Sequence, residues 1–129
     1  MNLLLDTHVL LWWLSDDTRL GDQARSAIAD ARSRVWVSAA SAWEVVIKAA
    51  LGRLALPGPP AEVVRTALTE NDFTSLAITI DHALAVSALP AIHADPFDRI
   101  LVAQAIAERL TLVTADTIFV RYPVPVLPA

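Results

Sequence analysis

The chain contains no cysteine among its 129 residues, and charged residues make up only 19% of it. The absence of cysteine excludes disulfide bonds and thiolate metal sites, and it is consistent with a reducing compartment such as the cytoplasm. The three histidines, His8, His82 and His93, show neither the i,i+2 nor the i,i+4 spacing of zinc motifs. We therefore expect that no histidine competes as a metal ligand and that His93 lies in a loop.

Long hydrophobic runs are absent as well, although 55% of the residues are hydrophobic. The longest run, Val9 to Leu14, is far too short to cross a bilayer. The N-terminus has neither the basic region nor the cleavage site of a signal peptide. A net charge of −4 disfavours a general nucleic-acid coat protein, but not an enzyme that meets RNA through a few arginines and a bound cation. We expect one cytoplasmic domain spanning residues 1–129.

Short apolar runs alternate along the chain with segments of helical periodicity. The apolar runs predict strands at residues 2–5, 35–37, 76–78 and 110–114, and a proline-flanked edge strand at 124–126. Helices are predicted at residues 7–14, 22–32, 61–70, 81–89 and 97–109, and another, capped by Ser38 or Ser41, reaches Leu51. This alternation predicts an α/β protein with a parallel sheet.

Four acidic residues stand where predicted strands end or helices begin. Asp6 follows the first strand, Glu44 follows the second, and Asp98 and Asp116 lie on either side of the last long helix. In an open parallel sheet the carboxyl ends of the strands form the crevice where ligands bind. Carboxylates that meet there repel one another unless a cation lies between them. The pattern therefore predicts an all-oxygen site for Mg²⁺ or Mn²⁺, as in a metal-dependent phosphodiesterase.

Three of these acids also have a structural explanation. Asp6 and Asp116 are placed where a helix N-cap is the ordinary use of aspartate. The segment from Ser41 to Glu44 matches a capping box, and Glu44 is four residues from Lys48, the spacing of a favourable ion pair. Capping and metal binding are compatible roles, so both remain open for each residue.

The segment that opens the last long helix carries a second acid. Asp95 is expected to be the N-cap, with Pro96 at the first helical position, and it remains a candidate for a supporting role in the site. Asp98 lies beside apolar neighbours, where a purely structural role is hardest to justify. Arg99 either reaches a substrate phosphate or is a solvated helix arginine. His8, two residues after Asp6, is a candidate for the site entrance.

Together these residues resemble a PIN domain, and more narrowly the VapC-type toxins of bacterial toxin–antitoxin pairs. The resemblance spans nearly the whole chain and rests on four blocks in the family's order: Asp6-Thr7-His8, Ser41-Ala42-Trp43-Glu44, Asp95-Pro96-Phe97-Asp98-Arg99 leading into Leu101-Val102-Ala103-Gln104-Ala105, and Leu112-Val113-Thr114-Ala115-Asp116. The resemblance implies a three-layer α/β/α sandwich with a short parallel central sheet. It also implies a homodimer, an RNA substrate and a small cognate antitoxin as partner.

By the same resemblance, Asp6, Glu44, Asp98 and Asp116 form the catalytic and metal-binding site, and Thr114 supports it. The expected reaction is hydrolysis of an RNA phosphodiester by water that a bound Mg²⁺ activates, with Mn²⁺ as a plausible substitute, so no protein nucleophile is needed. We assign Asp6 and Asp98 as direct metal ligands. Glu44 and Asp116 either bind through water or complete a second metal position.

Competing interpretations fit the residues less well. A phospho-acceptor receiver domain needs an acid pair on its first strand and a lysine after its last, but the only lysine is Lys48 in mid-helix. A haloacid-dehalogenase-like phosphatase needs two aspartates two residues apart, where this chain has Asp6-Thr7-His8. The alternative that stays open is a non-catalytic module of the same fold that binds RNA or a protein.

The first predicted helix is apolar around its whole circumference. Adjacent helical residues point in different directions, so Trp12 and Trp13 cannot both face the core. Either the second helix or the loop at residues 57–60 covers the apolar surface that does not face the core, or this surface forms an exposed patch, which typically marks an interaction site. By resemblance, that site would receive a hydrophobic segment of the antitoxin, which would also place a basic side chain among the acids.

Overall fold

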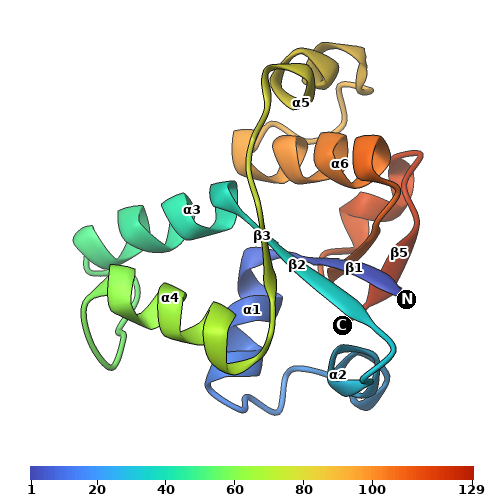
Figure 1. Cartoon of the computed structure of the whole chain (residues 1–129). Coiled ribbons are helices and arrows are strands. Elements are labelled where there is room, and N and C mark those ends of the chain that lie inside the picture. Colours follow the sequence, from blue (N-terminus) through green and yellow to red (C-terminus); the bar gives the residue numbers. More distant parts are fainter.

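The computed structural model describes all 129 residues as a five-stranded parallel sheet covered by helices on both faces, with strand order β3-β2-β1-β4-β5 (Figure 1). The strands are β1 (Asn2–Leu5), β2 (Arg34–Ser38), β3 (Thr74–Leu76), β4 (Thr111–Thr114) and β5 (Val126–Pro128). The helices are α1 (Thr7–Leu14), α2 (Asp22–Ala29), α3 (Ala39–Ala50), α4 (Pro60–Glu70), α5 (Ile80–Ala85) and α6 (Pro96–Glu108), with 3₁₀ turns η1 (Val86–Ala88) and η2 (Thr117–Arg121). The predicted three-layer α/β/α architecture is confirmed.

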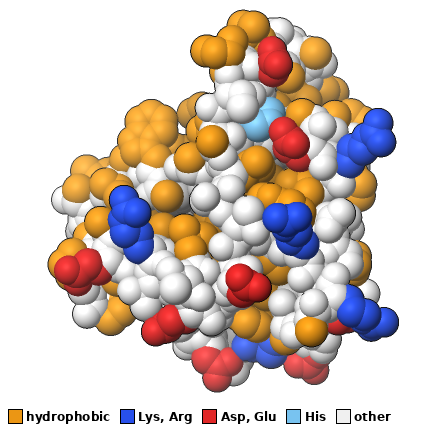
Figure 2. All heavy atoms as spheres, viewed as in Figure 1, with side chains coloured by type: hydrophobic (Ala, Val, Ile, Leu, Met, Phe, Trp, Pro, Cys, Tyr) orange, Lys and Arg blue, Asp and Glu red, His pale blue; other side chains and the backbone are white.

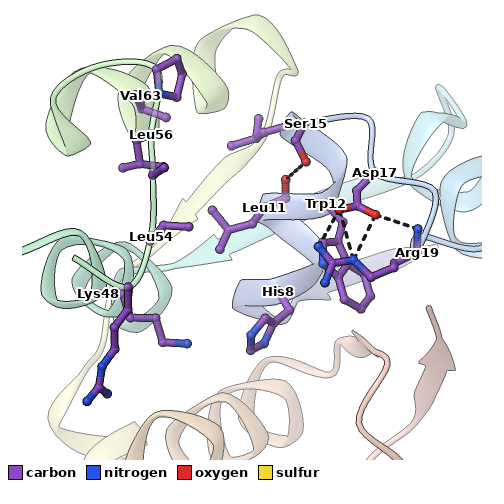
Figure 3. A pocket seen from close by; sticks show the side chains of 14 residues that line it. His8, Leu11, Trp12, Ser15, Asp17, Arg19, Lys48, Leu54, Leu56 and Val63 are labelled. Carbon is purple, nitrogen blue, oxygen red and sulfur yellow. Dashed lines mark hydrogen bonds and ion pairs between the residues drawn. The ribbon is translucent and has the colours of Figure 1, made fainter. Parts of the chain in front are cut away.

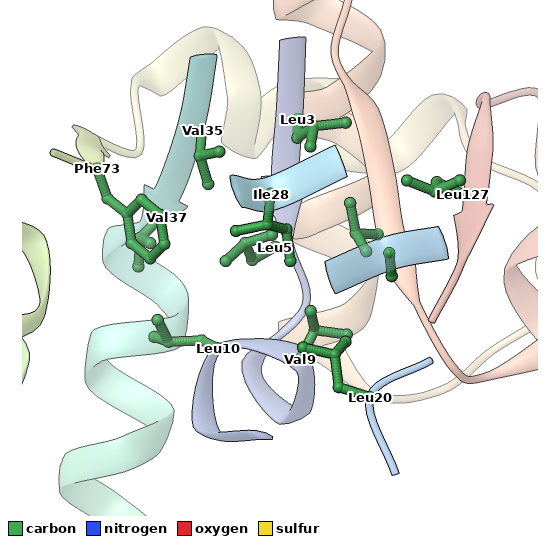
Figure 4. Close-up of a cluster of buried hydrophobic side chains, with 12 residues drawn as sticks. Leu3, Leu5, Val9, Leu10, Leu20, Ile28, Val35, Val37, Phe73 and Leu127 are labelled. Atoms are coloured by element: carbon green, nitrogen blue, oxygen red, sulfur yellow. The ribbon is translucent and has the colours of Figure 1, made fainter. Parts of the chain in front are cut away.

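The alternation of side chains along β1 supplies both halves of the core. Leu3 and Leu5 point to one face and join a cluster with residues of α1 and α2, drawn in Figure 4. Leu4 points to the other face and packs with α6. All three leucines are fully buried, and each contributes on the order of 1.5–3 kcal/mol relative to an exposed position. Because both faces of β1 are buried, its last three residues are apolar without alternation.

The strand order places the ends of β1 and β4 side by side. β1 pairs with both β2 and β4, and Leu5 is in register with Val113. The backbone N–H of Asp6 continues this ladder by donating to the Val113 carbonyl at 3.0 Å. The chain switches direction across the sheet at β1, so the crevice typical of such switch points opens beyond these two strands. The residues at the ends of these strands, Asp6 and Thr114, therefore lie at the base of this crevice.

Several element boundaries differ from the prediction. α2 ends at Ala29 instead of residue 32, because Asp30 adopts an extended conformation and its carboxylate accepts the Arg32 N–H at 2.9 Å. β3 lies two residues earlier than predicted, since Thr74–Leu76 are the residues that pair with β2. The helix predicted at 81–89 is split into α5 and η1, and β5 is Val126–Pro128. β5 is an edge strand, as predicted.

An apolar surface lies where α3 meets the start of α6, on the face visible in Figure 2. We call it the α3–α6 face; it is lined by Ala40, Trp43, Ile47, Ile78, Pro96, Phe97 and Ile100. The Trp43 side chain is 61% exposed and its ring packs edge-on against Phe97, with 5.3 Å between ring centroids. An exposed cluster of this kind typically marks an interaction site.

Candidate active site

All four predicted acids line one pocket of about 440 Å³ at the carboxyl end of the sheet. They reach it from four separate segments: the end of β1, the second turn of α3, the first turn of α6 and the turn after β4. The full lining is Asp6, His8, Trp12, Arg19, Glu44, Lys48, Asp95, Asp98, Ala115 and Asp116. The convergence expected from the sequence is therefore present in the fold, and His8 lines the same pocket, as expected.

Asp6 occupies the deepest position. It is only 6% exposed, and its Oδ2 accepts a 2.7 Å hydrogen bond from the Thr114 hydroxyl. Although its backbone lies at the N-cap position of α1, its side chain makes no capping hydrogen bond. Burial raises the pKa of Asp6, and the Thr114 hydroxyl partly counteracts the rise. The carboxylate is thus held towards the pocket and is not used to cap the helix.

Asp98 is presented by the first turn of α6. Asp95 caps this helix, because its Oδ1 accepts from the N–H groups of Phe97 at 2.8 Å and Asp98 at 3.4 Å. Pro96 follows at the first helical position, as the sequence predicts. Burial, together with the charges of Asp6 and Asp95, raises the pKa of Asp98 to about 7. A carboxyl group with such a pKa in a pocket is typical of a functional site.

Glu44 reaches the pocket from α3 and is 8% exposed. Its Oε2 lies 3.0 Å from the Lys48 Nζ, which confirms the predicted ion pair. The predicted capping box is wrong: Ser38 caps α3 by accepting from the Ala40 N–H, and Ser41 lies inside the helix. Because Ser41 faces α1, its hydroxyl accepts a 3.0 Å hydrogen bond from Thr7, which ties α3 to the segment carrying Asp6.

Asp116 combines a structural role with a place in the pocket. Its Oδ1 caps η2 by accepting from the Ile118 N–H at 3.0 Å, as the sequence suggested. Its own N–H donates to the Thr114 hydroxyl at 3.1 Å. Thr114 therefore bonds to both Asp6 and Asp116 and fixes their relative position. The Asp116 side chain remains 48% exposed, so it marks the open edge of the site.

His93 is the site residue that sequence reasoning missed. It lies in a loop, as predicted, but its Nε2 is 2.7 Å from the Asp98 Oδ2 and 4.0 Å from the Asp116 Oδ2. One donor atom from each of these three residues lies within 4.8 Å of the others, close enough to hold a metal ion. The loop brings His93 to the acids without any local spacing motif, so His93 is a candidate ligand that the expectation from histidine spacing did not include.

Arg99 makes backbone contacts that neither interpretation of the sequence included. Its guanidinium donates to the backbone carbonyls of Val86 at 3.1 Å, Pro90 at 2.9 Å and His93 at 3.4 Å. These bonds hold the segment between η1 and α6 against the helix and engage the guanidinium with backbone carbonyls. Its contribution to the site is to anchor the loop that carries His93.

The donor set of the pocket suits a hard divalent cation. Carboxylate oxygens are the preferred protein ligands of Mg²⁺ and Mn²⁺, and several of them crowd here with only Lys48 and Arg19 as neighbouring basic side chains. The raised pKa values of Asp6 and Asp98 express the cost of burying these carboxylates, to which the charges of the neighbouring acids add. A bound cation would remove this cost, so the residues fit the metal that the sequence predicts.

A groove of about 540 Å³ adjoins the acidic pocket on the side of α1 (Figure 3). Its apolar wall includes Leu11, Trp12, Leu54, Leu56 and Val63, and its rim carries His8, Lys48 and Arg53. Trp12 lines both the groove and the acidic pocket.

The two tryptophans of α1 have different surroundings. The Arg19 guanidinium lies over the Trp12 ring at 5.2 Å. The Trp12 side chain is half-buried in the wall of the groove. Trp13 points elsewhere: its Nε1 donates to Asn71 at 2.9 Å and its ring packs against Phe73. Neither tryptophan forms an exposed patch by itself. The apolar surface of α1 that does not face the core lines the groove, and Pro57 of the 57–60 loop lines it too.

Comparison with known families agrees with this arrangement. The family model of the PIN domain matches residues 3–125 of the chain. The chain belongs to the PIN domain family. A curated relative, Ribonuclease VapC22 of Mycobacterium tuberculosis, is 36% identical over 115 residues, which cover 88% of this chain and 86% of the relative. This similarity places the chain among the VapC-type members of the family.

Solved structures show the same fold. VapBC2 from Rickettsia felis, bound to a DNA fragment from its promoter, contains a chain with a TM-score of 0.75 and 15% identity, with 99% of this chain and 98% of that chain covered. A toxin–antitoxin complex from Klebsiella pneumoniae gives a TM-score of 0.67 and 24% identity, with 97% and 95% covered. No helix of the present structure combines the length and the apolar character needed to cross a membrane.

Proposed function

We propose that this VapC-type nuclease is a Mg²⁺-dependent endoribonuclease, formed by residues 1–129 as one cytoplasmic domain, that acts as the toxin of a toxin–antitoxin pair. The observation that carries the proposal is the convergence of Asp6, Glu44, Asp98 and Asp116 in one pocket. The identity to a named ribonuclease over most of the chain supports RNA as the substrate. A pKa of about 7 at Asp98 supports a cation as the natural neighbour of the carboxylates.

The residues have distinct roles in this proposal. Asp6 and Asp98 would hold the metal directly, because they are the two acids whose pKa values are raised by burial. Glu44, already paired with Lys48, and the exposed Asp116 would hold it through water or complete a second position. When bound, the metal would activate water and neutralise charge on the phosphoryl oxygens. Thr114 would keep Asp6 and Asp116 in place through its hydroxyl.

A cleavage assay on a mixed pool of cellular RNA tests this proposal. The purified protein should cut RNA in the presence of Mg²⁺ or Mn²⁺ and stop on addition of EDTA, with Asp6→Asn as the matched inactive variant. Cleavage that persists in EDTA would refute metal dependence. Binding of the RNA pool without any cleavage at saturating metal would favour a non-catalytic module.

For partners, we propose a cognate antitoxin in the groove beside α1 and a second copy of the chain at the α3–α6 face. The groove is apolar with a basic rim and continues into the acidic pocket through Trp12, so a segment with a hydrophobic stretch and a basic residue would complement both. Structural neighbours that are themselves toxin–antitoxin complexes support the first partner. The exposed Trp43 and its apolar neighbours support the second.

Two alanine variants separate these interfaces and serve as controls for each other. Trp12→Ala should weaken antitoxin binding, measured by calorimetry, and leave the oligomeric mass unchanged. Trp43→Ala should lower the oligomeric mass measured by light scattering and leave antitoxin affinity unchanged. Loss of a buried aromatic anchor typically costs about 2 kcal/mol or more in binding. An unchanged antitoxin dissociation constant in Trp12→Ala would refute the placement in the groove, and Trp13→Ala, which lies outside the groove, should bind like the wild type.

A further inference from the structure

His93 is held in place by two backbone hydrogen bonds and one ring contact. Its backbone N–H donates to the Tyr122 hydroxyl at 2.8 Å, and its carbonyl accepts from Arg99 at 3.4 Å. Its ring lies edge-on to the buried Phe119, with 6.3 Å between centroids. Side chains that are fixed in this way lose little freedom when they bind a ligand, so the imidazole is pre-organised towards the acids.

The Nε2 atom of this imidazole points at the outer part of the acidic pocket. It is 2.7 Å from the Asp98 carboxylate and 4.0 Å from that of Asp116. The three residues come from a loop, a helix start and the turn after β4, yet a donor atom of each lies within 4.8 Å of the others. The side chains of His93 and Asp116 are 25% and 48% exposed, so this group is open to an ion arriving from solvent.

This outer group is distinct from the inner part of the site. Asp6 is almost completely buried and bonds to Thr114, whereas Asp116 lies at the solvent edge. Asp98 is the residue common to both parts, since it lines the same pocket as Asp6 and His93 contacts its Oδ2. One carboxylate placed between two donor groups is the arrangement by which a protein holds two neighbouring cations.

We propose that His93 is a nitrogen ligand at an outer cation position shared with Asp98 and Asp116, and that it makes this position prefer Mn²⁺ to Mg²⁺. The inference rests on the proposed metal dependence and names the second metal position within it. Mg²⁺ demands oxygen ligands in near-ideal octahedral geometry, whereas imidazole suits first-row transition metals better. The inner position, whose donors are all oxygens, keeps no such preference. The chain would therefore carry two positions of different metal selectivity.

Pulsed electron paramagnetic resonance of bound Mn²⁺ tests the ligand directly. In the purified full chain loaded with Mn²⁺ alone, a directly bound ¹⁴N should give a nuclear modulation that disappears in His93→Ala. The matched control is His8→Ala, because His8 lines the acidic pocket with Asp98 and Asp116 but lies outside the three-residue group. The modulation should persist in this control. His93→Gln keeps a hydrogen-bond donor for Asp98 without the imidazole, so it should fold like the wild type and still lack the modulation.

Calorimetric titration gives an independent readout. His93→Ala and His93→Gln should weaken Mn²⁺ binding at the outer position by about tenfold or more, as loss of metal-site residues typically does. Mg²⁺ affinity should change far less in both variants. Mn²⁺ binding without nitrogen modulation in the wild type, or modulation that survives in His93→Ala, would overturn the role of His93 and leave the proposed function intact. Absence of any Mn²⁺ or Mg²⁺ binding to the wild type would overturn both.

Discussion

The two ends of α6 carry buried polar groups of opposite character. At its N-terminal end, Asp98 shares a pocket with other acids and has a pKa raised to about 7. In its C-terminal half, Gln104 is completely buried and Glu108 pairs with a buried histidine. Both ends place polar atoms among apolar ones, but only the first crowds like charges. The comparison separates polar groups that serve a site from those that serve the fold.

The network around Gln104 is satisfied on every side. The Ser38 hydroxyl donates to its Oε1 at 2.6 Å, and its Nε2 donates to the Ala77 carbonyl at 3.3 Å. His82 accepts the Thr79 N–H at Nδ1 and lies 2.8 Å from Glu108 through Nε2. These bonds join β2, α5 and α6. A buried network with all partners present rigidifies the fold, whereas the acidic pocket gathers like charges that a bound cation would neutralise.

The largest effect should come from Asp98→Asn at the charged end of α6. Loss of one carboxylate removes a proposed metal ligand, so RNA cleavage should fall by about a hundredfold or more, beyond the usual effect of a supporting residue. The fold should persist, because the substitution reduces repulsion among the acids. Cleavage rates and circular dichroism on the purified variant check this. Wild-type rates in Asp98→Asn would remove that residue from the site.

Metal addition should stabilise the protein by binding in the acidic pocket at the N-terminal end of α6. A ligand that binds only the folded state adds about 2.7 kcal/mol when present at about 100 times its dissociation constant. Millimolar Mn²⁺ or Mg²⁺ should therefore raise the thermal midpoint, and Asp6→Asn should blunt the rise. Calorimetric melting across a metal titration measures both. An equal rise in the wild type and in Asp6→Asn would show that the ions bind elsewhere.

At the other end of α6, Gln104→Leu should lower stability without changing the chemistry. The leucine fills a similar volume but leaves the Ser38 hydroxyl and the Ala77 carbonyl without their partner. Each orphaned buried group costs about 1–3 kcal/mol. Urea denaturation should show this loss, while cleavage per folded molecule and the metal-induced rise stay near wild type. A loss of activity larger than the loss of folded protein would break the contrast between the two ends.

The charged end of α6 should also make the stability of the metal-free protein depend on pH. The pKa of Asp98 is raised in the fold from its ordinary 3.8 to about 7. Between these values the unfolded chain releases this proton while the folded chain still holds it, so the folded state loses relative stability as pH rises. Thermal midpoints in EDTA should therefore decrease from about pH 4 to about pH 7, less steeply in Asp98→Asn, with Gln104→Leu as the control that keeps the wild-type slope.

Much of the fold could be predicted because local signals and tertiary packing agree. β1 and α1 begin and end as predicted, and Asp95 with Pro96 starts α6 at the predicted place. The errors fall where tertiary contacts decide between local alternatives. Ser41 has capping-box neighbours, but Ser38 lies at the true helix start and Ser41 bonds to Thr7 across the structure. β3 is set by its pairing with β2, which no local pattern reports.

The sequence by itself determined the alternation of strands and helices and the four acids at their junctions, because periodicity and strand-end position are local properties. Only the tertiary structure decided which groups the acids would meet. It brought Thr114 to Asp6 across 108 positions of the chain, turned Arg99 to the loop carbonyls and placed His93 against Asp98. The strand order and the path of the loop before α6 set these contacts. The packing of the whole chain fixes the strand order and the loop path, and the spacing of residues along the sequence does not reveal them.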